Sequence, residues 1–261
     1  MPMLVRPDGV ELHWEERGQG APVVLVCACM SFPAVFEDLV SLLAEEHRLV
    51  SYDPRGSGAS TRRGPYEQAT DAGDLEALLE EVGPAVLVTL GDGCNRAVRV
   101  AARRPELVHA IVTPGGNPLG RSVLGSSEGL AASQSVLSAL VEMLRTDYRA
   151  ALRTTMSTTN PQMDDDQVRE RVDAMADYAP QDVTLARLLA WIEDDAAEEA
   201  RVAGQKLWLL HHPHNPWFPL DIVEPTREAL PEAHVEVVED GPLSRPDITA
   251  AVVRRLSAAG R

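Results

Sequence analysis

Two short segments of the chain carry side chains that can transfer protons or attack an electrophile. The segment His211-His-Pro-His214 has three imidazoles among four residues. Because histidine titrates close to neutral pH, His211 and His214 are candidate catalytic acids or bases, and His212 is a candidate ligand contact. The spacing H-H-x-H matches no recognised metal-ligand pattern, and no Cys-x-x-Cys pair accompanies it. We therefore predict proton transfer by this segment and no metal site.

The other segment is the glycine-rich turn Gly91-Asp-Gly-Cys94. Asp92 could serve as a general acid or base, or it could cap a helix by accepting hydrogen bonds from free backbone N–H groups. Cys94 could be a nucleophile, although free cysteines are commonly small buried residues. The residues of this region that we expect to contact a ligand are Gly91, Gly93, Cys94 and Asn95.

Both segments follow apolar runs that alternate with helical patterns. Strands are predicted at Val10–Glu15, Val23–Cys27, Arg48–Tyr52, Ala85–Leu90, Val108–Thr113, Lys206–Leu210 and His234–Val238. Amphipathic helices are predicted at Phe36–Glu46, Asp71–Val82, Asn95–Arg104, Asp221–Leu230 and Pro246–Leu256. Short connections between them indicate a parallel, doubly wound sheet. Because loops at the carboxyl ends of parallel strands converge, both segments should line one crevice, together with Cys27, Cys29 and Trp217.

A different pattern occupies residues 119–202. It contains three helical segments, Gly129–Thr155, Asp164–Asp177 and Asp182–Ala200, and no convincing strand. Pro161 and Pro180 mark the breaks between them. We predict that 119–202 form a helical cap over an α/β core built from 1–118 and 203–261. Such a cap would enclose a pocket from which water is excluded.

Composition limits the partners of the chain. Its 261 residues, 44% of them hydrophobic, suffice for one α/β core. A net charge of −16 disfavours binding to nucleic acid and to anionic membranes, so we expect a small-molecule partner. We also expect no cofactor. The first residues lack a secretory-signal pattern, no apolar run reaches about 18 residues, and three cysteines cannot all pair with one another. These features predict a cytoplasmic protein, and they leave its oligomeric state open.

Two motifs resemble the α/β-hydrolase superfamily, and the similarity extends over nearly the whole chain. They are Asp53-Pro-Arg-Gly-Ser-Gly-Ala-Ser60 and the helix end Ala101-Ala-Arg-Arg-Pro-Glu-Leu-Val108. The resemblance implies the α/β-hydrolase fold, which is a mostly parallel sheet with an inserted helical cap. It also implies a nucleophile on the tight turn after a central strand, in the pattern small-x-Nuc-x-small.

This sequence departs from the family pattern at every triad position. Counting back from Pro105 aligns Thr89-Leu-Gly-Asp-Gly93 with the turn, so Gly91 takes the place of the nucleophile, and a shift of two residues would put Gly93 there. Gly241-Pro242 stands where the family has Gly-His, and Asn215 stands near the place of the acid. The early His-Gly is replaced by Cys27-Ala-Cys29. Without nucleophile, base and acid, acyl-enzyme chemistry has no evident route.

Three functions remain open. We rank first a non-hydrolytic enzyme that catalyses cyclisation, elimination, isomerisation or condensation of an apolar small molecule, as in specialised-metabolite biosynthesis, using Asp92, a histidine of the 211–214 segment and the backbone amides of the turn. The second is a non-catalytic pseudo-hydrolase that only binds a small molecule. The third is an ester or epoxide hydrolase with a displaced nucleophile. Asp92 in that role, as in epoxide hydrolases, needs Leu90 and Cys94 at the small positions, whereas Cys94 needs a shift of three residues.

Overall fold

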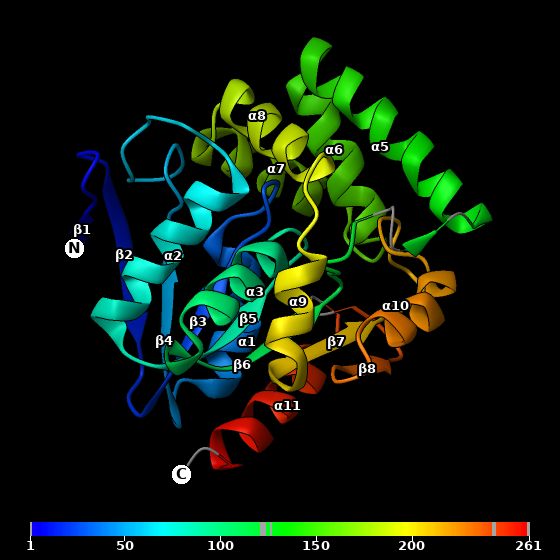
Figure 1. The fold of residues 1–261 in the computed structure, drawn as a ribbon. Helices are drawn as coiled ribbons and strands as arrows, with labels where there is room; N and C mark the ends of the chain where they lie inside the picture. The colour runs from blue at the N-terminus through cyan, green and yellow to red at the C-terminus, as the bar shows by residue number, and fades with distance from the viewer. Residues whose placement is uncertain (1, 121–123, 126, 242–243, 260–261) are drawn as a thin grey trace.

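The computed structural model describes residues 2–120, 124–125, 127–241 and 244–259. Within this part of the chain one sheet runs in the order β1-β2-β4-β3-β5-β6-β7-β8 (Figure 1). The strands are β1 (Met3–Val5), β2 (Glu11–Arg17), β3 (Ala21–Val26), β4 (His47–Tyr52), β5 (Ala85–Thr89), β6 (Val108–Pro114), β7 (Leu207–His211) and β8 (His234–Val237). Only β1 and β2 pair antiparallel with their neighbours. The mostly parallel sheet is thus confirmed, and the short exposed strand β1 is an addition to it.

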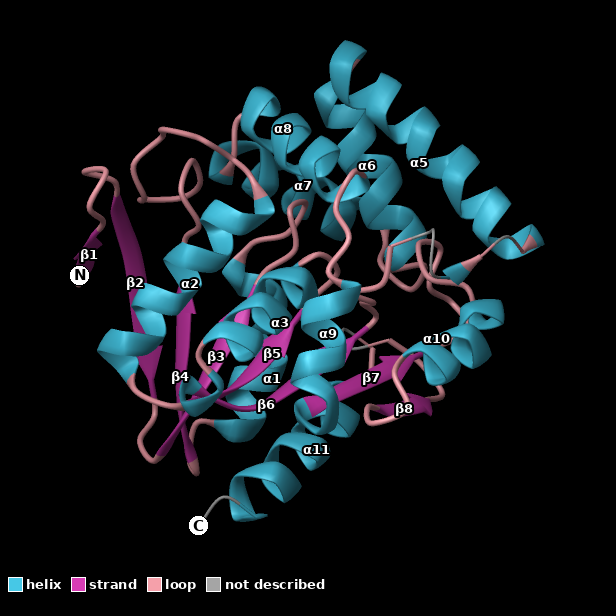
Figure 2. Cartoon of the chain, viewed as in Figure 1, coloured by secondary structure: helices cyan, strands magenta, loops and turns pink. Residues whose placement is uncertain are grey.

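Helices cover both faces of the sheet (Figure 2). On one face α2 (Gln68–Val82), α3 (Gly93–Arg103) and α9 (Ala197–Ala203) pack side by side, and on the other α1 (Glu37–Leu43) packs on α11 (Pro246–Ala259). The short helix α10 (Val223–Ala229) precedes β8. Successive residues of a strand point to opposite faces, so Val23 and Val24 of β3 belong to the two separate apolar clusters. A strand buried on both faces explains the continuous apolar run seen in the sequence.

In the described part of the chain, four helices form the cap above the carboxyl ends of the strands: α5 (Glu128–Thr146), α6 (Tyr148–Thr159), α7 (Asp165–Tyr178) and α8 (Gln181–Ile192) (Figure 1). The single helix predicted over Gly129–Thr155 is wrong, because Asp147 leaves the helical conformation at φ −147°. Its side chain instead accepts a hydrogen bond from Ala150 N at 3.0 Å and begins α6. The helix predicted over Asp182–Ala200 is likewise two helices, α8 and α9. Of these, α9 packs on α3 beside the sheet, although it lies inside the predicted cap segment.

Buried hydrogen bonds and an ion pair connect the cap to the core. Arg187 of α8 lies 3.1 Å from the carboxylate of Asp71 on α2 and donates to the carbonyl of Arg55 at 2.7 Å. Both members of the Arg187–Asp71 pair are buried. Buried charge pairs of this kind are costly to break singly, so the cap has a defined position over the strand ends.

The described residues contain neither a membrane-spanning helix nor a cluster of metal ligands. None of the helices there combines the length and apolar character needed to cross a bilayer. No three or more histidine, cysteine or acidic side chains in that part of the chain converge as metal ligands.

Candidate active site

A cavity of about 190 Å³ lies between the cap and the loops that follow the parallel strands. Six of the predicted site residues line it: Cys29, Gly91, Asp92, His212, His214 and Trp217. Five others lie outside its lining: Cys27, Gly93, Cys94, Asn95 and His211. The two segments singled out in the sequence therefore meet at one cavity, but only some of their side chains face it.

The turn after β5 contains two glycines, Gly91 and Gly93, and the sequence count aligns Gly91 with the family's nucleophile. Gly91 has φ +48°, in the left-handed region that favours glycine, and a Cβ there would lie 3.2 Å from the Cβ of Ala28. A Cβ on Gly93 would lie 2.8 Å from the carbonyl oxygen of Val26, so that position also needs glycine. Both backbone positions therefore favour glycine, which is compatible with the register that needs no gap.

The carboxylate of Asp92 occupies the space beside this turn. Its Oδ1 accepts from Cys29 N at 2.7 Å, and its Oδ2 accepts from Gln68 Nε2 and Arg96 Nη2, each at 3.1 Å. Asp92 is 3% exposed and Arg96 is 0% exposed. Asp92 does stand at the N-cap position of α3, but its side chain makes no capping hydrogen bond to that helix.

This contact changes the chemistry that the turn can perform. Serine hydrolases of this fold stabilise the oxyanion with the N–H after the nucleophile and with an N–H from the loop that corresponds here to the one after β3. Cys29 lies in that loop, and its N–H already binds the Asp92 carboxylate. A substrate oxyanion formed at Gly91 would have to displace the Asp92 carboxylate from Cys29 N.

The cysteines are poorly suited to nucleophilic attack. Cys94 is fully buried, and its Sγ lies 3.3 Å from the Thr113 hydroxyl that donates to it. Burial raises the pKa of the Cys94 thiol to about 12, and that of Cys27 likewise to about 12. Cys29 does line the cavity, but burial and then the Asp92 charge raise its pKa. The thiolate is the nucleophilic form, so none of the three is activated.

His211 is fully buried at the end of β7, outside the cavity. Neither ring nitrogen has a hydrogen-bond partner among the described residues. Burial, with smaller contributions from His212 and Arg227, lowers the pKa of His211 to about 4, so its ring is neutral at pH 7. This position does not support the catalytic role predicted for His211.

His212 is the imidazole that faces the cavity. It is 8% exposed, and its ring lies between two glycines of the lining. A Cβ on Gly241 would lie 2.9 Å from His212 Cε1, and a Cβ on Gly115 would lie 3.4 Å from Nε2. Burial lowers the pKa of His212, whereas the carboxylate of Asp240 acts to raise it. A neutral imidazole in this position can accept a proton. His214 is exposed at the rim of the same cavity.

Asn215 is the residue that the sequence aligns near the family's acid. Its side chain makes hydrogen bonds to the backbone of neighbouring residues. Its Oδ1 accepts from Trp217 N at 3.0 Å and from Phe218 N at 3.1 Å, and its Nδ2 donates to Gly115 O at 3.1 Å. These bonds give it a structural role. The carbonyl of Trp217 in turn accepts from the Ser133 hydroxyl of α5 at 2.9 Å, so this loop is tied to the cap. Pro242, which stands at the place of the family's histidine, lies outside the described residues.

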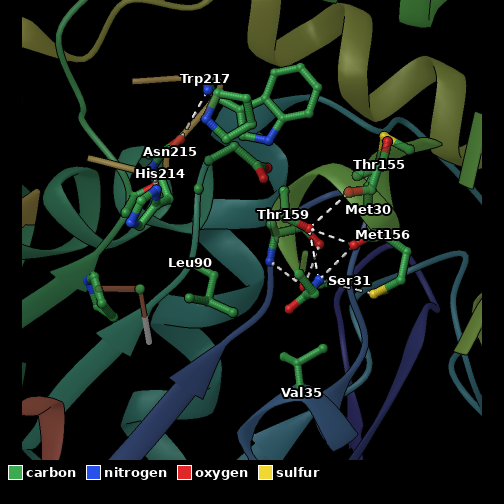
Figure 3. A pocket seen from close by; sticks show the side chains of 18 of the residues that line it. Met30, Ser31, Val35, Leu90, Thr155, Met156, Thr159, His214, Asn215 and Trp217 are labelled. Carbon is green, nitrogen blue, oxygen red and sulfur yellow. Dashed lines mark hydrogen bonds between the residues drawn. The ribbon is translucent and has the colours of Figure 1, made fainter. Parts of the chain in front are cut away.

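Most of the lining was not predicted from the sequence. Figure 3 shows Thr155, Met156 and Thr159 of α6 on one side, near Met30 and Ser31, with His214, Asn215 and Trp217 on the other. Of these, His214 and Trp217 were predicted, whereas the α6 residues were not. Further unpredicted residues of the lining are Leu90, Leu137, Leu140, Asn160, Leu188, Trp191 and Asp240. An amphipathic pattern shows that a cap helix has a buried face, but it does not distinguish a face on the cavity from one on the core.

The comparisons with known proteins identify the family and the fold of the chain. A sequence model of the alpha/beta hydrolase fold family matches residues 22–241, and the chain belongs to that family. It is 31% identical over 106 residues to a 2-(acetamidomethylene)succinate hydrolase of Mesorhizobium japonicum, covering 40% of this chain and 38% of the relative. It is 32% identical over 112 residues to a cis-3-alkyl-4-alkyloxetan-2-one decarboxylase of Shewanella oneidensis, covering 40% of this chain and 35% of the relative. The matched region therefore spans well under half the length of either protein.

Among solved structures, an esterase from Exiguobacterium antarcticum superposes with a TM-score of 0.83 at 17% identity, covering 98% of both chains. At this identity the likeness concerns the fold alone. The comparisons thus support the family and the fold of this chain.

Proposed function

We propose that this protein is a non-hydrolytic enzyme of the α/β-hydrolase family that converts an apolar small molecule by proton transfer. The reaction classes that fit are elimination, isomerisation, cyclisation and condensation. One observation supports the proposal above all: the Asp92 carboxylate accepts from Cys29 N beside Gly91, the residue that the count back from Pro105 aligns with the nucleophile. Formation of an acyl-enzyme needs both a nucleophile and a free oxyanion site, and this turn provides neither.

The proton-transfer step is assigned to His212. Its buried ring lines the cavity and is neutral at neutral pH because burial lowers its pKa. The carboxylate of Asp240, on the loop after β8, would stabilise the imidazolium that forms when the ring takes a proton. His214 at the rim is a second candidate for exchanging that proton with solvent. Among the relatives, one is named a hydrolase and another a decarboxylase, so the family's fold is compatible with more than one reaction type.

The contacts of Asp92 and Cys94 oppose the displaced-nucleophile alternative. Asp92 is held by Cys29, Gln68 and Arg96, and the Cys94 thiol is buried away from the cavity with a raised pKa. Ligand binding without turnover is the second candidate function. The observation that favours it is the set of internal hydrogen bonds made by Asn215, which occupy the place of the family's acid.

A first experiment tests hydrolysis directly. The purified protein is incubated with p-nitrophenyl acetate, with styrene oxide and with a fluorophosphonate probe, and its intact mass is measured. We expect no turnover above the buffer rate and no covalent adduct, whereas a family esterase run in parallel should give both. Ester turnover with an adduct on any side chain would overturn the proposal.

A second experiment separates catalysis from binding. A cell extract is incubated with the wild-type protein, His212→Ala or the control His109→Ala, whose histidine is exposed on β6. We expect metabolites that change with wild type and His109→Ala but not with His212→Ala, and whose products have gained no water. Binding of a metabolite without conversion by any of the three proteins would favour the second candidate.

A further inference from the structure

A second, smaller cavity lies beside the main cavity of about 190 Å³. It has a volume of about 50 Å³, and we call it the side cavity. Its lining includes Leu130 and Ser133 of α5, Asn95 at the start of α3, and Phe218. Asn95 is one of the ligand contacts expected from the sequence, and it lies outside the main cavity. The side cavity thus reaches the first turn of α3.

Three residues line both cavities: Leu137, Trp191 and Trp217. On α5 the neighbours of Leu137 are divided between the cavities. Ser133, one turn before it, lines only the side cavity, whereas Leu140, one turn after it, lines only the main cavity. The helix therefore passes from one cavity to the other at Leu137.

The same order recurs on two other segments. On α8, Leu188 lines only the main cavity and Ile192 only the side cavity, with Trp191 between them. On the loop after β7, Pro216 lines only the main cavity and Phe218 only the side cavity, with Trp217 between them. The three shared residues also belong to one apolar cluster. They form a wall between the cavities, and we call it the partition.

Packing and hydrogen bonds hold the partition in place. The Trp191 ring packs edge-on against Phe218, with ring centroids 6.0 Å apart. The backbone N–H of Trp217 donates to Asn215 Oδ1 at 3.0 Å (Figure 3), and its carbonyl accepts from the Ser133 hydroxyl at 2.9 Å. These contacts come from the loop and from both cap helices, so the wall has a defined position.

Both cavities favour an apolar, uncharged ligand. Among the described residues, no arginine or lysine lines either of them. A carboxylate or phosphate in this space would lose its hydration without gaining a counter-ion. The carboxylate of Asp194, which lines the side cavity, is already paired with Arg99 at 2.7 Å. Leucine and indole surfaces bind alkyl groups because both surfaces leave water together.

We infer that the partition of Leu137, Trp191 and Trp217 limits the length of the apolar chain that the main cavity accepts. A chain that fills the main cavity ends at these side chains, and the side cavity beyond them stays out of its reach. The three residues therefore determine specificity for ligand length. This inference rests on the proposed small-molecule function and concerns the size of its substrate.

The probes are the straight-chain alcohols from butan-1-ol to decan-1-ol, and isothermal titration calorimetry with the full-length protein measures their affinities. Each methylene that is buried should raise the affinity about fourfold. The rise should stop near hexan-1-ol in the wild type, because a volume of about 190 Å³ holds about six groups of near 30 Å³ each. Affinity that rises as far as decan-1-ol, or no binding of any alcohol, would overturn the inference.

Trp191→Ala opens the partition. The rise should then continue for at least about two more methylenes, because the side cavity of about 50 Å³ joins the main one. Trp208→Ala is the control, since this partly buried tryptophan of β7 lies outside both linings and its loss should leave the length limit at the wild-type value. A wild-type length limit in a folded Trp191→Ala protein would contradict the role of the partition.

Leu137→Ala tests the partition from a second helix. It should extend the length limit by about one methylene. The control Leu144→Ala, at a buried position of the same helix outside both linings, should not extend it. Melting curves establish that each variant is folded. An equal limit in the two folded variants would exclude Leu137 from the partition.

Filling the side cavity tests where the added length goes. Leu130→Phe, at a position that lines only the side cavity, is combined with Trp191→Ala and should shorten the limit again by at least about one methylene. Val136→Phe, at an exposed position of α5, should leave the limit of Trp191→Ala unchanged. No shortening by Leu130→Phe would contradict entry into the side cavity. All of these outcomes concern binding alone, so they leave the proposed function to be judged by hydrolysis and turnover.

Discussion

Two groups of polar residues lie near the cavity, and they differ in charge pairing and in how many of their members line it. In the first, which we call the elbow network, Asp92 and Asp71 are paired with Arg96 and Arg187. In the second, the open group of His212, Thr155 and Asn160, each residue keeps a buried nitrogen or oxygen without a partner in the described residues. The ion pairs hold the turn and the cap in position, although Arg96 and Arg187 also keep side-chain nitrogens without a hydrogen-bond partner in the described residues. The second group has no ion pair in that part of the chain, and its three residues all line the cavity. The elbow network therefore has a structural role, and the chemistry is expected at the open group.

The largest expected effect is on stability and comes from the elbow network. Asp92→Ala removes the carboxylate that faces the fully buried Arg96 and leaves Cys29 N without its acceptor. We expect the free energy of unfolding to fall by about 3–5 kcal/mol, measured by urea denaturation. The control Asp173→Ala breaks an exposed pair with Arg149 and should cost no more than about 1 kcal/mol. Equal losses in Asp92→Ala and Asp173→Ala would mean that the elbow network stabilises the protein no more than an exposed ion pair does.

The next largest effect concerns pH. The pKa of His211 is about 4 in the folded protein and about 6.5 when unfolded. Because the folded pKa is the lower one, its contribution to stability is present above about pH 6.5 and is lost as the pH falls towards 4. The loss amounts to about 3 kcal/mol, and urea denaturation across this range measures it. His211→Asn should flatten this dependence, whereas His109→Asn, on an exposed histidine, should keep it. An unchanged pH profile in His211→Asn would contradict the burial argument.

Restoring a serine tests how much of the hydrolytic site is gone. Gly91→Ser should cost about 1–2 kcal/mol because a side chain is strained at φ +48°. Gly83→Ser provides the same kind of backbone strain at φ +92°, where an added Cβ would meet no atom within 4 Å. Hydrolysis of p-nitrophenyl acetate by Gly91→Ser should not exceed that by Gly83→Ser, since Asp92 still holds the Cys29 amide. A clear gain in esterase rate would mean that the rest of a hydrolytic site survives.

The smallest expected effect is a shift in the pKa of His212, which belongs to the open group. Asp240→Asn removes the charge that acts to raise the pKa of His212, so this pKa should fall further below its usual value. The His212 Hε1 resonance in an NMR pH titration measures it. Glu239→Gln changes the adjacent exposed carboxylate, which is paired with Arg245, and should leave the His212 titration in place. A His212 pKa unchanged by Asp240→Asn would exclude electrostatic support from that carboxylate.

Sequence patterns predicted the regular elements better than their interruptions. The continuous apolar run of β3 identified a strand buried on both faces, and the family segment from Asp53 to Ser60 identified the fold. The division between α5 and α6 escaped prediction because aspartate is tolerated inside a helix, and Asp147 becomes a cap only when its φ changes. The places of Thr155 and Asn160 in the cavity lining escaped it as well, since they depend on which face of α6 lies over the strand ends.

The sequence alone determined that the turn after β5 lacks a serine, because the count back from Pro105 leaves only glycine at its centre. It also determined that histidines would follow β7. Only the tertiary structure decided that His212 faces the cavity while His211 is buried, because successive residues at a strand end point in opposite directions and the neighbouring loops settle which direction is open. The tertiary structure also decided that Asp92 binds the Cys29 amide, because that contact joins residues 63 positions apart in the chain.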